Sequence, residues 1–314
     1  MFDPTEFIEQ QIDEISEIQG KAVVGCSGGV DSTVAAVLVG KAMGSRLMAI
    51  YVDTGYMRKG ETQEMDKLFS EMDINHKIVD ARDEFYKAMA GVVDPEEKRK
   101  IIGNKFIEIF DREAEDFGAD HLVQGTIAPD WIESGDDVRE TIKSHHNVGG
   151  LPEIMKLKLI EPLRDLYKDE VRAVARELGL PTSERQPFPG PGLAIRVIGE
   201  ATPERTEIVR EACAIVEQEL ERAAEEGLIE LPWQYFAVLL PVRTVGVHGD
   251  KRAYGNTIAV RAVSSLDAMS ARFSDIPIDI LEKISVKITN TMKNEVNRVV
   301  FDITHKPPGT IEWE

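Results

Sequence analysis

The stretch GCSGGVDST at residues 25–33 decides the fold of the first half of the chain. It follows the short apolar run 21–25, which is typical of a buried strand, and it leads into an apolar helical run that extends to Met43. A glycine-rich turn between a strand and a helix leaves backbone N–H groups unpaired at the positive end of the helix dipole. Such a turn binds phosphate, because glycine lets the anion approach the backbone closely. The alternative is an ordinary helix cap formed by one of the turn's own serine or aspartate side chains.

Strands and helices alternate on both sides of this turn. Apolar runs predict strands at 46–52, 76–79, 121–124 and 157–160, and amphipathic patterns predict helices at 5–18, 61–72 and 168–178. The alternation predicts an α/β fold with a doubly wound parallel sheet, whose ligands bind at the carboxyl ends of the strands. Asp53 follows the second strand, and Gln124, Gly125 and Thr126 follow the fourth. We therefore expect these residues at the same rim of the sheet as the glycine-rich turn.

A second, smaller domain follows a segment that is dense in proline and glycine. Residues 181–192 read PTSERQPFPGPG, which favours a domain boundary, and we place the domains at 1–188 and 189–314. The later region is expected to contain helices at 202–226 and 277–292 and strands at 234–247, 257–263 and 298–304. This different order of elements predicts an α+β domain, and two domains suit a chain of 314 residues.

Composition excludes several classes of protein. The 37 lysines and arginines against 56 aspartates and glutamates give a net charge of −19, which disfavours binding to nucleic acid or to an anionic membrane. Two cysteines are too few for a disulfide framework or a cysteine-rich zinc site. The acidic start is unlike a signal peptide, and the apolar stretch Thr33–Gly40 is too short to span a bilayer. These features predict a cytoplasmic protein.

Two well-known phosphate motifs do not fit the turn. A Walker A loop requires a lysine that the turn lacks, and its glycines do not have the Gly-x-Gly-x-x-Gly spacing of dinucleotide-binding folds. The remaining pattern, Ser-Gly-Gly-x-Asp-Ser after a strand, resembles the pyrophosphate loop of the N-type ATP pyrophosphatases, which have an adenine nucleotide alpha hydrolase-like fold. The resemblance implies that ATP is bound and that Asp31 orders the turn or binds Mg²⁺. The residues it places on the phosphates are Ser27, Gly28, Gly29, Val30, Asp31, Ser32 and Thr33.

Further strings extend the resemblance over nearly the whole chain. They are DPEEKRKIIG at 94–103, QGTIAPDWIES at 124–134, KSHHNVGGLP at 143–152, RQPFPGPG at 185–192 and KPPGTIEWE at 306–314. Together and in this order they resemble the ATP pyrophosphatase and dimerisation portions of GMP synthetases. The implied reaction is ATP + XMP + NH₃ → AMP + PPi + GMP. An NAD synthetase, which shares the loop, and an ATP-sensing module without catalysis are the rival interpretations.

The GMP synthetase resemblance also implies roles for individual residues. A mobile lid over the triphosphate is implied for Asp94, Glu97, Lys98, Arg99 and Lys100. Lys143 and His146 are implied near the phosphates as catalytic residues, and Asp53, Gln124, Gly125 and Thr126 as part of the ATP site. Binding of XMP is implied for Arg196, Lys306, Ile311 and Glu312, with Lys306 on its phosphate. The alternatives are a solvated helix face for the basic lid residues and an ordinary polar tail for Lys306.

Two expectations about partners follow from the resemblance. GMP synthetases carry an N-terminal glutaminase domain, and here the ATP loop begins at residue 27, so we expect a stand-alone, archaeal-type subunit that receives ammonia from a separate glutamine amidotransferase subunit. Neither Cys26 nor Cys213 has the setting of an activated nucleophile. A homodimer through the C-terminal domain is expected, unless its apolar strand residues fill the domain's own core. These residues are Tyr235, Phe236, Val238, Leu239, Val299, Val300 and Phe301.

Overall fold

The computed structural model describes residues 2–129, 157–181, 185–248, 251–265 and 268–314. The chain divides into two compact units. Unit 1 comprises Met1–Asp53, Gly60–Ala81 and Asn104–Arg185, and unit 2 comprises Thr54–Lys59, Arg82–Gly103 and Gln186–Glu314. Unit 2 thus takes in two segments that the sequence pattern assigns to the first domain. The roles of the two predicted domains stay predictions.

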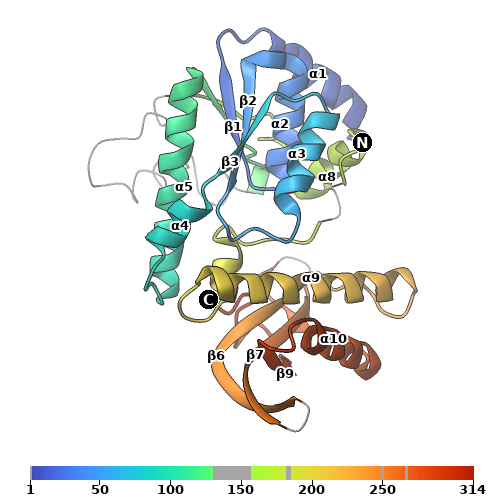
Figure 1. Ribbon diagram of the computed structural model, residues 1–314. Helices are drawn as coiled ribbons and strands as arrows, with labels where there is room; N and C mark the ends of the chain where they lie inside the picture. Colours follow the sequence, from blue (N-terminus) through green and yellow to red (C-terminus); the bar gives the residue numbers. More distant parts are fainter. Residues whose placement is uncertain (1, 130–156, 182–184, 249–250, 266–267) are drawn as a thin grey trace. The chain divides into compact units, whose positions relative to one another are not determined.

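Unit 1 is built on a parallel sheet of five strands in the order β3-β2-β1-β4-β5 (Figure 1). The strands are β1 (Ala22–Cys26), β2 (Leu47–Asp53), β3 (His76–Asp80), β4 (His121–Val123) and β5 (Lys158–Ile160). The central strand β1 pairs in parallel with both β2 and β4, and its residues Ala22, Val23 and Val24 are buried. The parallel α/β fold predicted from the alternating pattern is therefore confirmed.

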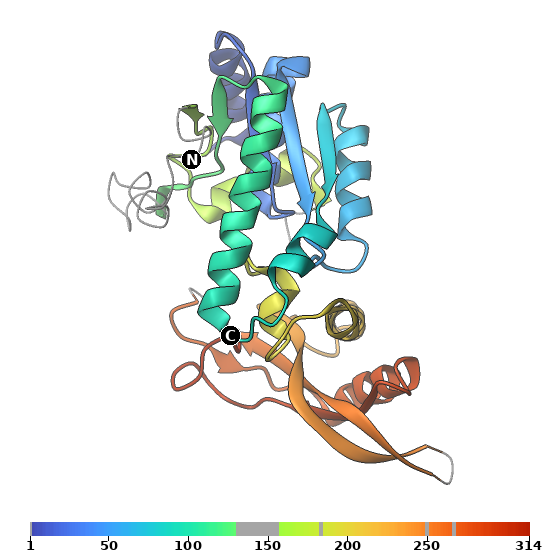
Figure 2. The same ribbon diagram turned by 60° about the vertical axis from the view of Figure 1, so that its left-hand side comes forward.

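Helices cover both faces of this sheet. They are α1 (Pro4–Ser16), α2 (Val30–Met43), α3 (Glu61–Glu71), α5 (Pro95–Phe117, in unit 1 from Asn104 onward) and α8 (Lys168–Glu177). Helices α1, α2 and α8 pack against one another on one face, which explains why α2 is buried nearly all round. Helix α5 crosses the other face, where the Phe110 ring lies against Gly25 of β1 (Figure 2). A Cβ at Gly25 would be 3.2 Å from that ring, so a small residue is needed there.

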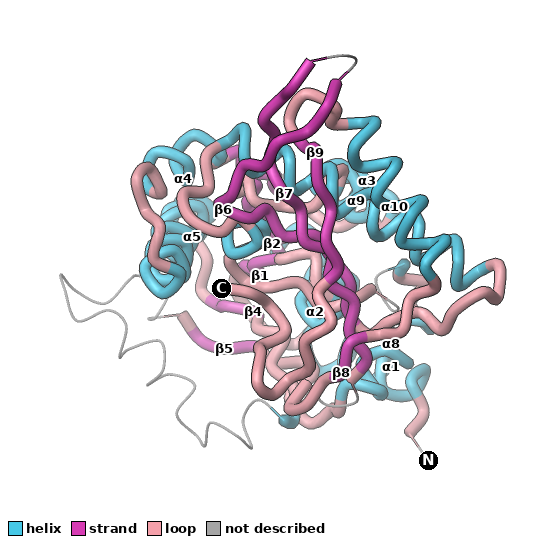
Figure 3. Tube along the Cα trace, turned by 90° about the horizontal axis from the view of Figure 1, so that it is seen from below, coloured by secondary structure: helices cyan, strands magenta, loops and turns pink. Residues whose placement is uncertain are grey.

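Unit 2 is an α+β unit around a mixed sheet (Figure 3). Its elements are α4 (Arg82–Ala88), the short helix η4 (Gly192–Arg196), α9 (Pro203–Glu225), β6 (Gln234–His248), β7 (Lys251–Ser264), β8 (Arg272–Phe273), α10 (Ile278–Thr291) and β9 (Val296–Phe301). Strand β7 pairs antiparallel with β6 and β8 and parallel with β9. Helices α9 and α10 pack together against this sheet. The predicted second α+β region is thereby confirmed.

Helix α9 begins where the sequence predicts. The Thr202 side chain accepts a hydrogen bond from the Arg205 N–H at 3.3 Å, and Pro203 is the first helical residue. Among the residues that the structure describes, no helix is both long and apolar enough to cross a membrane.

Candidate active site

The glycine turn, residues 27–33, joins β1 to α2 in unit 1. Gly29 is the N-cap of α2, and no side chain among the described residues caps this helix end. The Thr33 hydroxyl instead donates to the Gly29 carbonyl at 2.8 Å, and the Ser32 hydroxyl donates to the same carbonyl at 3.2 Å. The first-turn N–H groups of α2 are therefore not covered by a side-chain cap. This favours the phosphate-binding interpretation over the ordinary helix cap.

The loop after β4 lies directly on the first turn of α2. A Cβ at Gly125 would be 2.9 Å from the carbonyl carbon of Asp31 and 3.0 Å from the backbone nitrogen of Ser32. Only glycine fits so close to another backbone without displacing it. The neighbouring Gln124 has a buried side-chain oxygen with no hydrogen-bond partner among the described residues, and Thr126 is buried. The carboxyl ends of β1 and β4 thus bring these predicted residues beside the glycine turn.

Asp31 is paired with a lysine that the sequence pattern does not single out. The Lys168 ammonium lies 2.6 and 2.8 Å from the two Asp31 carboxylate oxygens. Lys168 is the first residue of α8, which packs on α2, so the two helix starts meet at this pair. The side chains are 30% and 47% exposed, and a pair this open is worth little. Asp31 can therefore exchange Lys168 for a metal ion at small cost.

A buried carboxylate supports the other side of the turn. Glu61, the first residue of α3, is 1% exposed and accepts a hydrogen bond from Arg185 at 3.2 Å. The Arg185 guanidinium also pairs with Glu64. Gly28 has a φ of +76°, and a Cβ there would be 2.4 Å from a Glu61 carboxylate oxygen. Glycine at 28 therefore meets both a backbone and a space requirement.

Asp53 lies at the end of β2, as its position in the sequence predicts. Its carboxylate accepts a hydrogen bond from the Thr62 hydroxyl at 3.0 Å. The bond fixes the carboxylate at the same rim of the sheet as the glycine turn, since β2 and β1 are parallel neighbours. Contact of Asp53 with a nucleotide stays a prediction.

The predicted lid residues form the start of α5 within unit 2. The Asp94 carboxylate accepts from the Glu97 N–H at 2.9 Å, as a helix cap does, and Lys100 is exposed. Lys98 differs from both, because its side chain is 0% exposed. Its ammonium donates to the carbonyls of Ala194 at 3.1 Å and Val197 at 2.7 Å and to the Glu314 carboxylate. Burial lowers the pKa of Lys98, and the Glu314 carboxylate opposes this effect.

Arg99 lies on the same turn of α5 as the other lid residues. Its guanidinium pairs with Glu96 at 3.3 Å and donates to the Glu314 carbonyl. A lid role over the triphosphate stays a prediction for all five residues.

Two of the four predicted XMP-binding residues form a buried pair in unit 2. The Arg196 guanidinium is 1% exposed and donates to the Glu312 carboxylate at 2.8 and 3.1 Å. Its carbon lies 4.2 Å from the centre of the Phe236 ring and 5.1 Å from that of Phe188. The Gln234 side chain also donates to Glu312, at 2.9 Å. Charge-assisted, two-point pairing of this kind fixes the direction of the carboxylate.

The other two predicted XMP-binding residues are Lys306 and Ile311. The Lys306 ammonium donates to the Ala268 carbonyl at 2.7 Å, and its backbone pairs with Ala271. The Ile311 carbonyl accepts from Arg261 at 2.7 Å. The structure thus places Lys306 and Ile311 on the C-terminal segment, residues 302–314, with the Arg196–Glu312 pair.

Arg261 organises the C-terminal segment and was not predicted from the sequence. It is 1% exposed, and it donates to the Asp302 carboxylate at 2.7 Å and to the carbonyls of Thr304 at 3.0 Å and Thr310 at 2.7 Å. The available signal was a single charge within the apolar strand run 257–263. A buried arginine requires such a set of acceptors.

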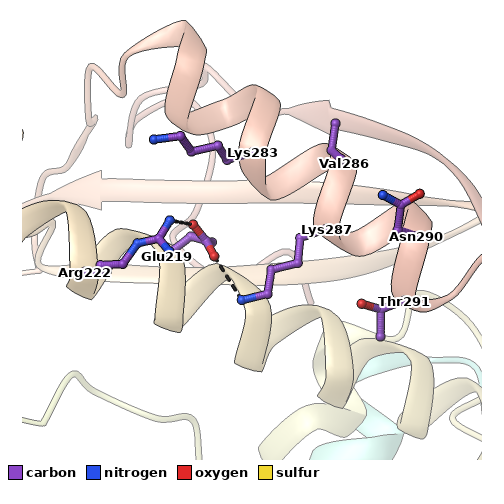
Figure 4. A pocket seen from close by; sticks show the side chains of 7 residues that line it. All are labelled: Glu219, Arg222, Lys283, Val286, Lys287, Asn290 and Thr291. Carbon is purple, nitrogen blue, oxygen red and sulfur yellow. Dashed lines mark hydrogen bonds and ion pairs between the residues drawn. The ribbon is translucent and has the colours of Figure 1, made fainter.

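A shallow cavity of about 440 Å³ lies between α9 and α10 (Figure 4). The residues that line it are Glu219, Arg222, Lys283, Val286, Lys287, Asn290 and Thr291. The buried Glu219 carboxylate pairs with Arg222 and, at 3.0 Å, with Lys287. None of these residues belongs to the predicted site, and the Glu219 pairs account for two of the cavity's three cations as structural.

Two predicted catalytic residues, Lys143 and His146, lie outside the described residues. Within the described ranges, no three His, Cys, Asp or Glu side chains gather in a group that could hold a metal ion. This fits Mg²⁺ that arrives with a triphosphate, because such ions take one or two protein carboxylates and several phosphate oxygens. Asp31 is the carboxylate in the right place for that role.

Both cysteines are buried and unlike reactive nucleophiles. Burial raises the pKa of Cys26 to about 12. Burial also raises the pKa of Cys213, whose sulfur accepts from the Ala237 N–H at 3.3 Å. A nucleophilic cysteine needs a lowered pKa and access to substrate, and these two thiols have neither.

A parallel α/β sheet with a Ser-Gly-Gly-x-Asp-Ser turn between its central strand and α2 defines the class of N-type ATP pyrophosphatases. In agreement, residues 2–106 match the family model described as NAD synthase, and residues 221–313 match the one described as GMP synthase C terminal domain. The combination of the two models narrows the class.

Relatives of similar length resolve the family. Proteins named as the second subunit of glutamine-hydrolysing GMP synthase are 56% identical over 311 residues in Thermoplasma acidophilum and 59% identical over 314 residues in Pyrococcus furiosus. The alignments cover 99% of both chains in the first case, and 98% of this chain and 97% of the relative in the second. The chain belongs to this family of GMP synthase second subunits, so the predicted resemblance is confirmed. Among solved structures, an NH₃-dependent NAD synthetase from Campylobacter jejuni is 18% identical, with a TM-score of 0.44 over 57% of this chain and 75% of that chain.

Proposed function

We propose that the chain catalyses the C–N ligase step ATP + XMP + NH₃ → AMP + PPi + GMP. The observation that carries the proposal is identity of 56–59% along almost the full chain to second subunits of glutamine-hydrolysing GMP synthase. The uncapped glycine turn at the head of α2 supports it independently, because this turn suits a polyphosphate.

The first chemical step is adenylation. The C2 oxygen of XMP attacks the α-phosphorus of ATP, the bond to the bridging oxygen breaks, and pyrophosphate leaves with its electron pair. The glycine turn holds the β- and γ-phosphates through backbone N–H groups, and Asp31 releases Lys168 to bind Mg²⁺. Mg²⁺ and the backbone dipoles neutralise the charge that develops on the leaving pyrophosphate.

The second step is amination. Ammonia attacks C2 of the adenyl-XMP intermediate, AMP leaves with the former C2 oxygen, and a proton is lost to give GMP. Adenylation makes this displacement possible, because AMP is a far better leaving group than an unactivated oxygen. The residue that accepts the proton is not assigned by the described part of the chain.

XMP binds to the C-terminal segment in this proposal. The fixed Glu312 carboxylate accepts hydrogen bonds from the purine or the ribose, and the Lys306 ammonium leaves the Ala268 carbonyl to bind the XMP phosphate. Ile311 gives an apolar contact beside them. The buried Arg196 holds Glu312 ionised and in a single direction.

Ammonia comes from a separate glutamine amidotransferase subunit. The glutamine-hydrolysing names of the relatives support this source, and the two buried thiols of this chain are not suited to hydrolyse glutamine. The glutaminase docks in a complex that forms in the cytoplasm.

We also propose a homodimer through unit 2, but through residues other than those first expected. Tyr235, Phe236, Val238 and Leu239 are at most 2% exposed in the single chain, so they fill the unit's own core. The exposed apolar side chains lie farther along the β6–β7 hairpin: Val245 is 46% exposed, Val247 72% and Tyr254 63%.

The register of the hairpin places these exposed residues on one face. Val245 pairs directly with Tyr254, and Val247 is two residues along the same strand. The opposite face is covered, because Asn297 lies against Gly246 and Gly255. Light scattering of the wild type should give twice 35.0 kDa at micromolar concentration, and Val245→Lys should shift it toward the monomer. A wild type of 35.0 kDa counts against the dimer.

The function is tested with the purified chain, XMP, ATP and Mg²⁺, with either ammonium or glutamine as nitrogen donor. We expect GMP with ammonium, none with glutamine, and restored glutamine use when a glutaminase is added. Because free ammonia is the reactant, the rate at fixed total ammonium should rise with pH below the ammonium pKa. Amination of deamido-NAD in place of XMP would indicate an NAD synthetase, and XMP-independent behaviour toward ATP would indicate a sensing module.

A further inference from the structure

Lys98 is buried in a way that contact with ATP does not explain. An ammonium has three N–H donors, and removing it from water is expensive unless all three are satisfied. Lys98 has three acceptors in unit 2, namely two backbone carbonyls and the Glu314 carboxylate. Its side chain is 0% exposed, so in this structure it has neither a free donor nor access to a triphosphate.

The three acceptors lie on both sides of the Arg196–Glu312 pair. The Ala194 and Val197 carbonyls flank Arg196 in the chain, at the end of η4. Glu314 is two residues beyond Glu312 on the C-terminal segment, and its other carboxylate oxygen accepts from the Gly199 N–H at 3.2 Å. A single ammonium therefore ties the backbone around Arg196 to the end of the segment that carries Glu312.

We propose that Lys98 is a positioning residue for XMP, which sets the Arg196–Glu312 pair by joining the η4 carbonyls to Glu314. The inference rests on the proposed function and deepens it, since it separates Lys98 from the exposed lid residues on the same helix. Lys98 itself touches neither substrate. Loss of the ammonium leaves the Glu314 carboxylate without its buried partner and releases the C-terminal segment from η4.

The inference is tested by steady-state kinetics of Lys98→Met with ammonium as nitrogen donor. The apparent KM for XMP should rise at least about 10-fold, the effect of losing one buried charged hydrogen bond, while the KM for ATP changes less than about twofold. Glu314→Gln removes the charge from the other partner and should act in the same direction but less strongly. In the double variant the two effects should be less than multiplicative, because neither side then leaves a buried charge unpaired.

Lys287→Met is the matched control. It removes a lysine that pairs at 3.0 Å with Glu219, a carboxylate that is 4% exposed in the same unit, but far along the sequence from the C-terminal segment. It should lower the thermal midpoint of unit 2 without raising the KM for XMP. An equal rise of the XMP KM in Lys98→Met and Lys287→Met would make Lys98 a general stability residue and overturn the inference.

A readout that does not depend on turnover completes the test. Amide hydrogen exchange in residues 310–314 should accelerate in Lys98→Met, while residues 22–33 keep their wild-type rates. A raised ATP KM with an unchanged XMP KM, or unchanged exchange in 310–314, would overturn the inference. Calorimetric titration of the wild type with XMP separates the two proposals: absence of XMP binding defeats the proposed function, whereas wild-type binding with an unaffected Lys98→Met defeats only the role of Lys98.

Discussion

The glycine turn of unit 1 and the C-terminal segment of unit 2 are ordered by opposite means. The turn is shaped by backbone: Gly28 and Gly125 provide a positive φ and a close approach, and its one ion pair, Asp31–Lys168, is partly exposed. The segment is held by side-chain charge, because Arg196, Arg261 and Lys98 are almost fully buried and each has acceptors in or beside it.

The difference corresponds to what each region binds in the proposed reaction. A triphosphate carries spread-out charge that backbone N–H groups and a metal ion can meet, and pyrophosphate must also leave. A purine monophosphate is recognised at a few directed groups, which requires carboxylate and ammonium groups held in place beforehand. Damage to the turn should therefore affect the chemical step, and damage to the segment should affect XMP affinity.

The largest effect is expected for Asp31→Ala. Adenylation should fall about 100- to 1,000-fold at saturating XMP and ATP, because a group that stabilises the transition-state charge is lost. The measurement is the single-turnover rate of AMP formation. Asp13→Ala, which removes an exposed aspartate from α1 of the same unit, should keep the wild-type rate. A near-normal rate for Asp31→Ala would remove the glycine turn from the mechanism.

Lys306→Ala should have a smaller effect, confined to XMP. A charge-assisted phosphate contact is worth about 1.5–3 kcal/mol, so the KM for XMP should rise about 10- to 150-fold with little change in the KM for ATP. Lys293→Ala removes an exposed lysine from the end of α10 and is the control. Equal effects of Lys306→Ala on both substrates would contradict its assignment to XMP.

Gly125→Ala sharpens the comparison from the side of the turn. Its Cβ would meet the Asp31 backbone at 2.9 Å, so the turn must shift by a few tenths of an ångström, and the adenylation rate should fall about 10-fold. Gly40→Ala controls for crowding, because its Cβ would meet only the Ile74 side chain. That variant should lose stability and keep its KM for ATP. A normal rate in Gly125→Ala would show that the close approach is unimportant.

The smallest effect is expected from thiol modification. The pKa of Cys26 is raised to about 12, so its thiol stays protonated at neutral and mildly alkaline pH and gains thiolate character only as the pH rises toward that value. Native chain treated with iodoacetamide at mildly alkaline pH should remain unmodified at Cys26 and keep ammonia-dependent activity. Rapid inactivation through Cys26 would mean that the thiol is accessible and reactive.

The elements with strong local patterns were predictable from the sequence. The apolar runs of β1 and β2 and the Thr202–Pro203 start of α9 carry their own signals, so the parallel sheet and the later α+β region follow. The Ser-Gly-Gly-x-Asp-Ser turn is equally local, and its position at the strand end follows from the alternation of elements.

What the sequence could not provide were the pairings between distant residues. Lys168 lies 137 positions from Asp31, and Glu314 lies 216 positions from Lys98. No periodicity indicates such pairs, and Lys98 stood in a basic cluster that suggested a solvated face or a lid. Tyr235 and Phe236 illustrate the converse, because an apolar strand run looks the same whether it fills its own unit or meets a partner.

XMP-dependent exchange of labelled pyrophosphate into ATP, measured without ammonia, tests the division of labour most directly. We predict exchange by the wild type only when XMP is present. Exchange by Lys306→Ala should recover at high XMP concentration, whereas exchange by Asp31→Ala should stay absent at every XMP concentration. Exchange that is independent of XMP, or an Asp31→Ala defect that excess XMP repairs, would contradict the assignment of the glycine turn to ATP and of the C-terminal segment to XMP.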